Sequence, residues 1–258
     1  MADELEVRIN RARTAQGDTL VALLHDANLQ VLASVLANPN LQEPHVRILV
    51  QRVDLPEQIL GLIAREPKWT KSEPIRLGLV QHPHTPRRDA LALLRQLFVF
   101  DLVHVCMHPG TPPEIRRIVE ELLAERAAQL PLGEKITLAR KGPTRVAGAL
   151  LAEGHSDVLP LVLVNPFLNE AQVLRVLARA SVPKQVVVAV AEHPKWSTHY
   201  NVRLALLHNA HTPISAALKF LPHVMLHDLR NLLREGVVAA HLREHVKHEL
   251  VRRTGGVR

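Results

Sequence analysis

The chain repeats itself at a fixed offset of 127 residues. Pro67, Lys68 and Trp69 recur as Pro194, Lys195 and Trp196, and 194 minus 67 is 127. Without a gap, the same offset pairs further identical residues, among them Asn38-Pro39 with Asn165-Pro166 and Asp101-Leu102 with Asp228-Leu229. A tandem duplication is the economical explanation of this register. Because duplicated helical units bury their apolar faces against their neighbours, the pattern favours one continuous array.

Short helices are the expected secondary structure along nearly the whole chain. Apolar residues recur at spacings of three and four, as in Ile115, Ile118, Val119, Leu122 and Leu123, and Pro, Asn or Gly residues separate the segments. No extended alternation of apolar and polar residues supports a sheet. The sequence therefore predicts an all-α fold, an α-solenoid of short antiparallel helix pairs.

The repeat also predicts the domain organisation. We expect a first solenoid half at residues 1–127, a second half at 128–250 that continues the first, and a flexible basic tail at 251–258. Residues 1–127 hold 15 Lys and Arg against 16 Asp and Glu, whereas residues 128–258 hold 17 against 9 and ten of the 16 histidines. This asymmetry indicates either an anionic partner for the second half or an ordinary soluble surface.

Recurrent blocks of the two copies carry a family resemblance. They are Val35-Leu36-Ala37-Asn38-Pro39, followed by Val46 and Arg52, and the segment from Val202 to Pro213. These blocks resemble the HEAT, armadillo and leucine-rich-variant class of α-solenoids over about residues 12 to 250. The resemblance implies a curved helical array that binds macromolecules, and it carries over no catalytic residues.

Candidate binding residues are the polar and aromatic ones that both copies keep. They are Lys68, Trp69, Arg76 and His84 in the first copy and Lys195, Trp196, Arg203 and His211 in the second. Arg together with Trp is typical of binding hot spots. In this interpretation the residues line two equivalent pockets, and the partner is a protein or peptide on the concave face.

The same residues also have a structural interpretation. HEAT-like arrays tie neighbouring repeats with Asp–Arg pairs, and Arg76 with Asp101 and Arg203 with Asp228 are similar in spacing. Each Trp would then pack beside a helix cap, which would be Thr70 in the first copy and Ser197 in the second. Both interpretations remain open at the level of sequence.

A weak metal-site candidate lies near the end of the chain. His241-Leu242-Arg243-Glu244-His245 matches the H-x-x-E-H pattern of inverted zinc peptidases, and His248 would follow on the same helix face. The first copy has Glu114 to Ile118 at these positions, and only 13 residues follow His245 (258 minus 245). A solvated helix face is therefore the preferred interpretation, with no metal bound.

Nucleic acid is the alternative partner. The basic second half would contact phosphates, with a salt-dependent affinity, and HEAT-like folds include DNA glycosylases. Aromatic residues make up only 3% of the chain, which argues against stacking on single-stranded bases. We find no glycosylase active-site motif.

The remaining signals bear on class and location. The chain shows no glycine-rich phosphate loop, no G-x-S-x-G elbow and no CxxC pair, so we expect no cofactor and no catalytic residues. The N-terminal segment does not read as a secretory signal, and the longest apolar run, around Val158 to Val164, is too short for a membrane span. A lone Cys106 fits a reducing compartment. We therefore expect a cytoplasmic, non-enzymatic scaffold.

Overall fold

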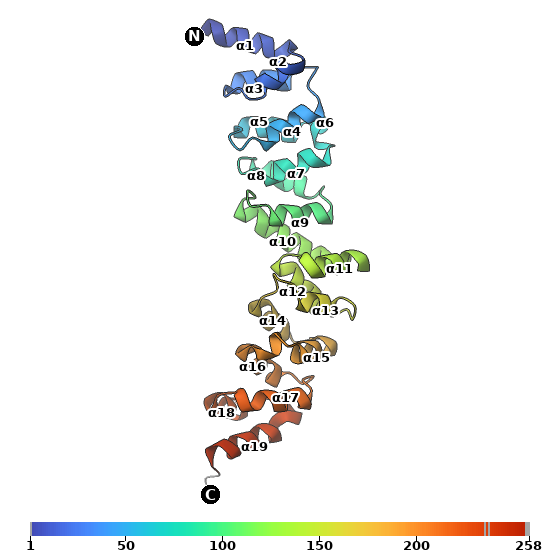
Figure 1. Ribbon diagram of the computed structural model, residues 1–258, viewed down its shortest axis with the longest axis vertical. Helices are drawn as coiled ribbons and strands as arrows, with labels where there is room; N and C mark the ends of the chain where they lie inside the picture. Colours follow the sequence, from blue (N-terminus) through green and yellow to red (C-terminus); the bar gives the residue numbers. More distant parts are fainter. Residues whose placement is uncertain (1, 235, 237, 256–258) are drawn as a thin grey trace. The chain divides into compact units, whose positions relative to one another are not determined.

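Helices make up the described structure of the chain. The computed structural model describes residues 2–234, 236 and 238–255, and within them it contains nineteen α-helices, three 3₁₀ helices and no strand (Figure 1). The predicted all-α class is confirmed. Among the described helices, none combines the length and the apolar character that crossing a membrane requires.

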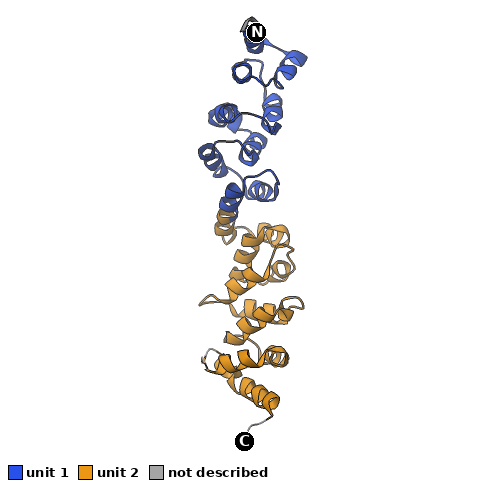
Figure 2. Cartoon of the chain, turned by 90° about the vertical axis from the view of Figure 1, so that its left-hand side faces the viewer, with its two compact units in different colours: residues 1–120 blue, residues 121–258 orange. Residues whose placement is uncertain are grey.

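The chain forms two compact units, residues 1–120 and 121–258 (Figure 2). The first contains α1 (Ala2–Thr14), α2 (Gly17–Leu23), α3 (Leu29–Leu36), α4 (Glu43–Gln51), α5 (Glu57–Arg65), α6 (Pro67–Thr70), α7 (Glu73–Gln81), α8 (Arg87–Leu94), α9 (Val99–Met107) and the start of α10 (Pro113–Ala127). The division lies within α10, N-terminal to the boundary at residue 127 expected from the repeat.

The second unit contains the remainder of α10 and the helices that follow it. These are α11 (Leu132–Lys141), α12 (Thr144–Glu153), α13 (Leu159–Leu163), α14 (Glu170–Leu177), α15 (Lys184–Glu192), η1 (Trp196–Thr198), α16 (Tyr200–His208), α17 (Ile214–Phe220), η2 (Leu221–His223), α18 (Leu226–Arg234), η3 (Ala240–Leu242) and α19 (Arg243–Thr254). Gly255 caps α19 with a φ of 73°, in the left-handed region that favours glycine. Residues 251–254, expected in the tail, are thus helical, and residues 256–258 lie outside the described residues.

Consecutive long helices belong to different rows in each unit. In the first unit α3 packs against α1 and α5, and α5 against α8, whereas α7 packs against α4 and α9. In the second unit α13 packs against α11 and α15, whereas α14 packs against α12 and α16. Helices of the two rows also contact each other, as α7 contacts α8 and α12 contacts α13.

Helix boundaries in the two units follow the same 127-residue offset. α7 begins at residue 73 and ends at 81, α16 begins at 200 and ends at 208, and both differences are 127. α5 and α15 match in the same way, as do α9 and α18. Pro56 and Pro183 are the residues directly before α5 and α15. Because proline fixes its own φ and lacks an N–H, it marks these helix starts in both units.

The core of each unit consists of aliphatic side chains at matching positions. Ile59, Leu60 and Ile63 of α5 are fully buried, and so are the corresponding residues of α15, which are Val186, Val187 and Val190. Burying one such side chain stabilises the fold by about 1.5–3 kcal/mol. The two units therefore bury the same helix faces with different aliphatic residues.

Candidate functional site

The two tryptophans kept in both copies are core residues. Trp69 is 6% exposed and Trp196 is 1% exposed. The Nζ atoms of Lys68 and Lys195 lie 4.3 Å and 4.1 Å from the centroids of the respective indole rings. Neither indole presents a face to an external partner, because each is covered by its own unit and a lysine.

Thr70 and Ser197 do not cap the helices that follow the tryptophans, so the predicted caps are wrong. Thr70 is the last residue of α6, and its hydroxyl donates to the carbonyl of Glu66 at 3.3 Å. In the second unit η1 takes the place of α6 and includes Ser197. The residue before α7 is Ser72, and the chain forms a separate short turn first because Pro67 starts one there.

Arg76 and Arg203 donate to main-chain carbonyl groups. Arg76 Nη1 lies 2.8 Å from the carbonyl oxygen of Thr70, and Arg203 Nε lies 2.6 Å from that of Ser197. The acceptors are equivalent, since 197 minus 70 is 127. Each arginine is the fourth residue of its helix and reaches back to a turn whose last carbonyls lack helical partners.

Asp101 and Asp228 have other partners, so the expected Asp–Arg ladder is not formed. Asp101 accepts a hydrogen bond from the backbone N–H of Phe98 at 3.2 Å, at the start of α9. Asp228 accepts from the hydroxyl of Tyr200 and lies 3.1 Å from Nε2 of His227. Burial and the hydrogen bond to Asp228 raise the pKa of Tyr200.

Buried asparagines make the most similar contacts in the two units. Nδ2 of Asn38 donates to the carbonyls of Ala12 and Ala15 at 2.8 Å and 3.0 Å. Nδ2 of Asn165 donates to the carbonyls of Ala139 and Gly142 at 2.8 Å and 3.2 Å, and every partner is displaced by 127. The Asn-Pro pairs were visible in the sequence, but their role as ties between α1 and α3, and between α11 and α13, was not.

His84 and His211 are exposed and lie after matching turns. Their backbone N–H groups donate to Nδ1 of His82 at 3.1 Å and to Oδ1 of Asn209 at 2.9 Å, respectively. His82 is buried, and this desolvation lowers its pKa. Its Nε2 lies 2.8 Å from the carbonyl of Arg52, so the neutral ring with hydrogen on Nε2 satisfies both contacts.

Candidate residues of the second unit line two separate cavities. Arg203 lines one of about 410 Å³ with Glu192, Lys219 and other residues between α15 and α17. His211 lines another of about 580 Å³ with Arg179 and other residues near the ends of α14 and α16. Lys195 and Trp196 line neither. The candidate residues of the second unit thus do not all line one cavity.

The His241, His245 and His248 candidate does not form a metal site. His241 lies in η3, before α19 begins, and its Nε2 is 2.9 Å from the carbonyl oxygen of Thr212. Across the part of the chain that the structure describes, no three His, Cys, Asp or Glu side chains come together as metal ligands.

Burial raises the pKa of the Cys106 thiol to about 12, which keeps it protonated at neutral pH.

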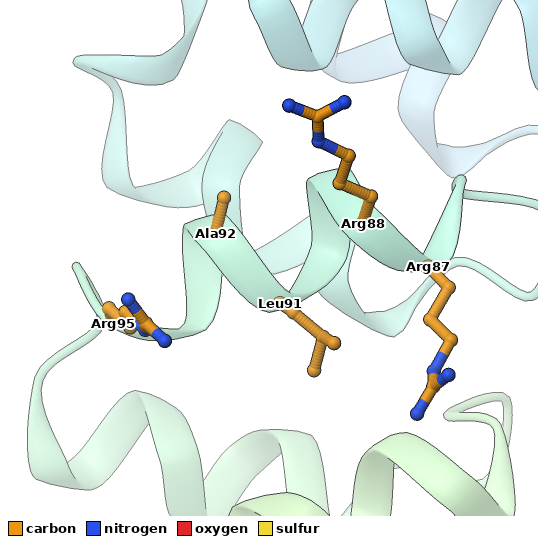
Figure 3. A pocket seen from close by; sticks show the side chains of 5 residues that line it. All are labelled: Arg87, Arg88, Leu91, Ala92 and Arg95. Atoms are coloured by element: carbon orange, nitrogen blue, oxygen red, sulfur yellow. The ribbon is translucent and has the colours of Figure 1, made fainter.

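A basic surface missed by the sequence analysis lies on α8. Arg87, Arg88, Leu91, Ala92 and Arg95 line a cavity of about 550 Å³ (Figure 3). The second unit has Ile214, Ser215, Leu218, Lys219 and Pro222 at these positions. The arginines were missed because the candidates were chosen for being kept in both copies. We refer to these five lining residues as the α8 basic surface.

No protein-family model matches the chain, and no similar curated protein or solved structure was found.

Proposed function

We propose that the chain is a non-enzymatic α-solenoid scaffold, built by tandem duplication, that binds another protein or peptide on an outward, concave helix row in the cytoplasm. Matching helix boundaries support the duplication. The paired hydrogen bonds of Asn38 with Asn165 and of Arg76 with Arg203 support it as well. Alternation of the helices between two rows is the packing that a solenoid requires.

One observation carries the functional part of this proposal. The tryptophans and arginines that both copies keep are engaged within the fold, whereas the repeated His84 and His211 are exposed. The indoles of Trp69 and Trp196 are buried, and the guanidinium groups of Arg76 and Arg203 bind backbone carbonyls. These four repeated residues therefore maintain the scaffold. Recognition is left to the outward faces, which differ between the units.

Cross-linking of the tagged full chain in its native cells, after nuclease treatment, tests the binding function. We expect a protein partner that also binds the purified chain at a defined stoichiometry. Loss of every cross-linked partner on nuclease treatment would contradict it. Small-angle scattering tests the solenoid, since a compact domain of this length has a radius of gyration of about 18 Å and an elongated array exceeds that value.

Nucleic acid remains a second candidate partner because of the charge of the second half. Residues 128–258 hold 17 Lys and Arg against 9 Asp and Glu, and exposed members of this set include Arg175, Lys184 and Arg230. An electrophoretic shift at two salt concentrations tests this function. Binding that weakens steeply with salt supports it, and no shift at low salt removes it.

A further inference from the structure

We propose that the α8 basic surface binds an acidic peptide segment of the partner protein, with carboxylates held by Arg88 and Arg95. The inference rests on the proposed scaffold function and specifies the chemistry of its partner. Its evidence is the placement of the three arginines, their charge pairing and the residues that lie between them.

The lining side chains point to both sides of α8. Arg88 and Ala92 point to one side of the helix and Arg87 and Leu91 to the other, with Arg95 at its C-terminal end (Figure 3). Arg88 and Arg95 are seven residues apart, which corresponds to about 10 Å along a helix axis. Two carboxylates of one peptide segment can span this distance.

The arginines differ in their charge pairing. Arg87 Nη2 lies 2.7 Å from Oε1 of Glu114. Asp89, the acidic residue of α8 itself, is engaged by Arg65 at 3.0 Å. Within the described residues, Arg88 and Arg95 have no hydrogen bond or ion pair. Two exposed guanidinium groups are therefore available to an external anion.

The helix dipole does not account for Arg88, whereas Arg95, at the C-cap of α8, lies where the dipole favours a cation. Arg87 and Arg88 are the first two residues of α8, where the helix dipole disfavours positive charge. The matching helix of the second unit, α17, starts with Ile214 and Ser215 and forms without arginine. We therefore attribute the unfavourably placed cations at the start of α8 to binding and not to the stability of the helix.

The chemistry of the surface favours a peptide over a nucleic acid. A guanidinium group binds carboxylates and phosphates alike with two parallel hydrogen bonds, so the neighbouring side chains decide between the two partners. Exposed Ala92 lies on the same side of α8 as Arg88, where an aliphatic side chain of a peptide can pack beside the guanidinium group. None of the five lining residues is aromatic, so bases would find no stacking platform here.

Fluorescence anisotropy with the full chain tests the inference. The probe is a labelled 12-residue peptide of alternating Glu and Leu, and the competitors are the same peptide with Lys for Glu, a 12-nucleotide single strand and inorganic phosphate. We expect Arg88→Ala/Arg95→Ala to weaken binding of the acidic peptide by about tenfold or more. The matched control, Arg47→Ala/Lys71→Ala, removes two exposed cations from the same unit and should change binding less than about twofold.

Three outcomes overturn the inference. They are absence of binding by the unsubstituted chain, equal losses in the two double variants, and displacement of the peptide by the oligonucleotide or phosphate at similar concentrations. The scaffold function is judged separately with the cross-linked partner. If Arg88→Ala/Arg95→Ala still captures that partner with unchanged affinity, the scaffold function stands and the assignment to α8 fails.

Discussion

The outward faces of α8 and α17 differ, although the two helices occupy matching places in their units. Their buried sides agree: Ala90 corresponds to Ala217 and Leu94 to Leu221, and all four are buried. Their exposed sides diverge. α8 and its C-cap together carry three arginines, whereas α17 exposes Ile214 and Leu218 to 44% and 48%.

This difference shows where constraint acts in a repeated helical chain. A buried position must fit its neighbours in both units, so it changes only among residues of similar size and polarity. An exposed position can acquire a charged residue in one unit while its counterpart in the other unit stays uncharged. The second half has the larger net positive charge, yet the α8 basic surface belongs to the first unit, so net charge alone does not locate a binding surface.

The largest expected change in the free energy of unfolding is at the tryptophans, and its size should differ between the two. Trp196 donates from Nε1 to the carbonyl of Leu163 at 2.9 Å, and its ring lies 5.3 Å from that of His199. Trp196→Ala should therefore lower the free energy of unfolding by about 3–5 kcal/mol. Trp69→Ala should cost less, because Trp69 is slightly more exposed and makes no indole hydrogen bond within the described residues.

Urea denaturation of both variants measures the difference, with Trp→Phe at each position as the control for ring volume. A larger cost at Trp69 than at Trp196 would contradict this ranking. If either Trp→Ala variant kept its stability and lost its partner, the pocket interpretation of the tryptophans would replace the packing interpretation.

Asn38→Ala and Asn165→Ala should lower the free energy of unfolding by similar amounts, because the two asparagines make matching hydrogen bonds in their units. Each change removes the Nδ2 donor of two carbonyl groups, although the carbonyl of Ala15 keeps a longer bond of 3.4 Å from Nδ2 of Asn40, and each should destabilise the chain by about 1–3 kcal/mol. Thermal and urea unfolding measure both values. The exposed Asn10 is a control, and Asn10→Ala should have little effect. Costs that differ widely between the units would show that the matching contacts are not equivalent in energy.

His82 should make the stability of the chain sensitive to acid at a position where the second unit has Asn209, which does not titrate. Burial lowers the pKa of His82 from the ordinary value of 6.5, so the unfolded chain takes up the proton first as the pH falls. The stability that neutral His82 contributes to the folded chain is fully present above pH 6.5, and it is lost progressively as the pH falls toward the lower pKa that His82 has in the folded state.

His82→Asn places the second unit's residue in the first and keeps an acceptor for the N–H of His84. We expect the melting temperature of this variant to fall less between pH 7 and pH 5 than that of the unsubstituted chain. His84→Asn, at an exposed position, is the control. The prediction is wrong if both variants retain the original pH dependence.

The smallest expected effect concerns the exposed sides of α8 and α17. Arg88→Ser introduces the residue of the second unit and should stabilise the chain by about 0.3–1 kcal/mol, because it removes a cation from the first turn of a helix. Ser215→Arg should do the reverse. Differential scanning calorimetry at low ionic strength resolves such shifts, and a destabilising Arg88→Ser would indicate that Arg88 has a role in the fold.

Helix positions and buried faces were the most predictable features of this chain. The 127-residue offset places Pro56 and Pro183 at equivalent positions, and a helix begins directly after each. The apolar spacing of three and four residues predicted helices with one buried face, as α5 has at Ile59. The roles of polar side chains were less predictable. Arg76, Arg203, Asn38 and Asn165 all bind main-chain carbonyls, which every residue possesses, so no residue type in the sequence marks the acceptor.

The repeat also directed attention away from the α8 basic surface. Residues kept in both copies, such as Trp69 and Trp196, include several that pack inside the fold, whereas Arg88 and Arg95 have Ser215 and Pro222 as counterparts. Short turns added a second difficulty. Thr70 and Ser197 fit the pattern of helix caps, but the chain forms the short helix α6 or η1 before the next helix begins. Thr and Ser hydroxyls hydrogen-bond the backbone both in caps and in such turns, so the sequence does not distinguish the two.

The sequence by itself determined that this chain is helical and which sides of its helices are buried, because these follow from local spacing and from proline. Only the tertiary structure decided what the repeated polar residues bind and which cations remain unpaired. Those properties depend on carbonyl groups and carboxylates brought close by packing, as with Asp89 and Arg65 or Glu114 and Arg87. The difference between α8 and α17 is visible in the sequence, but its significance depends on knowing which side of each helix remains exposed.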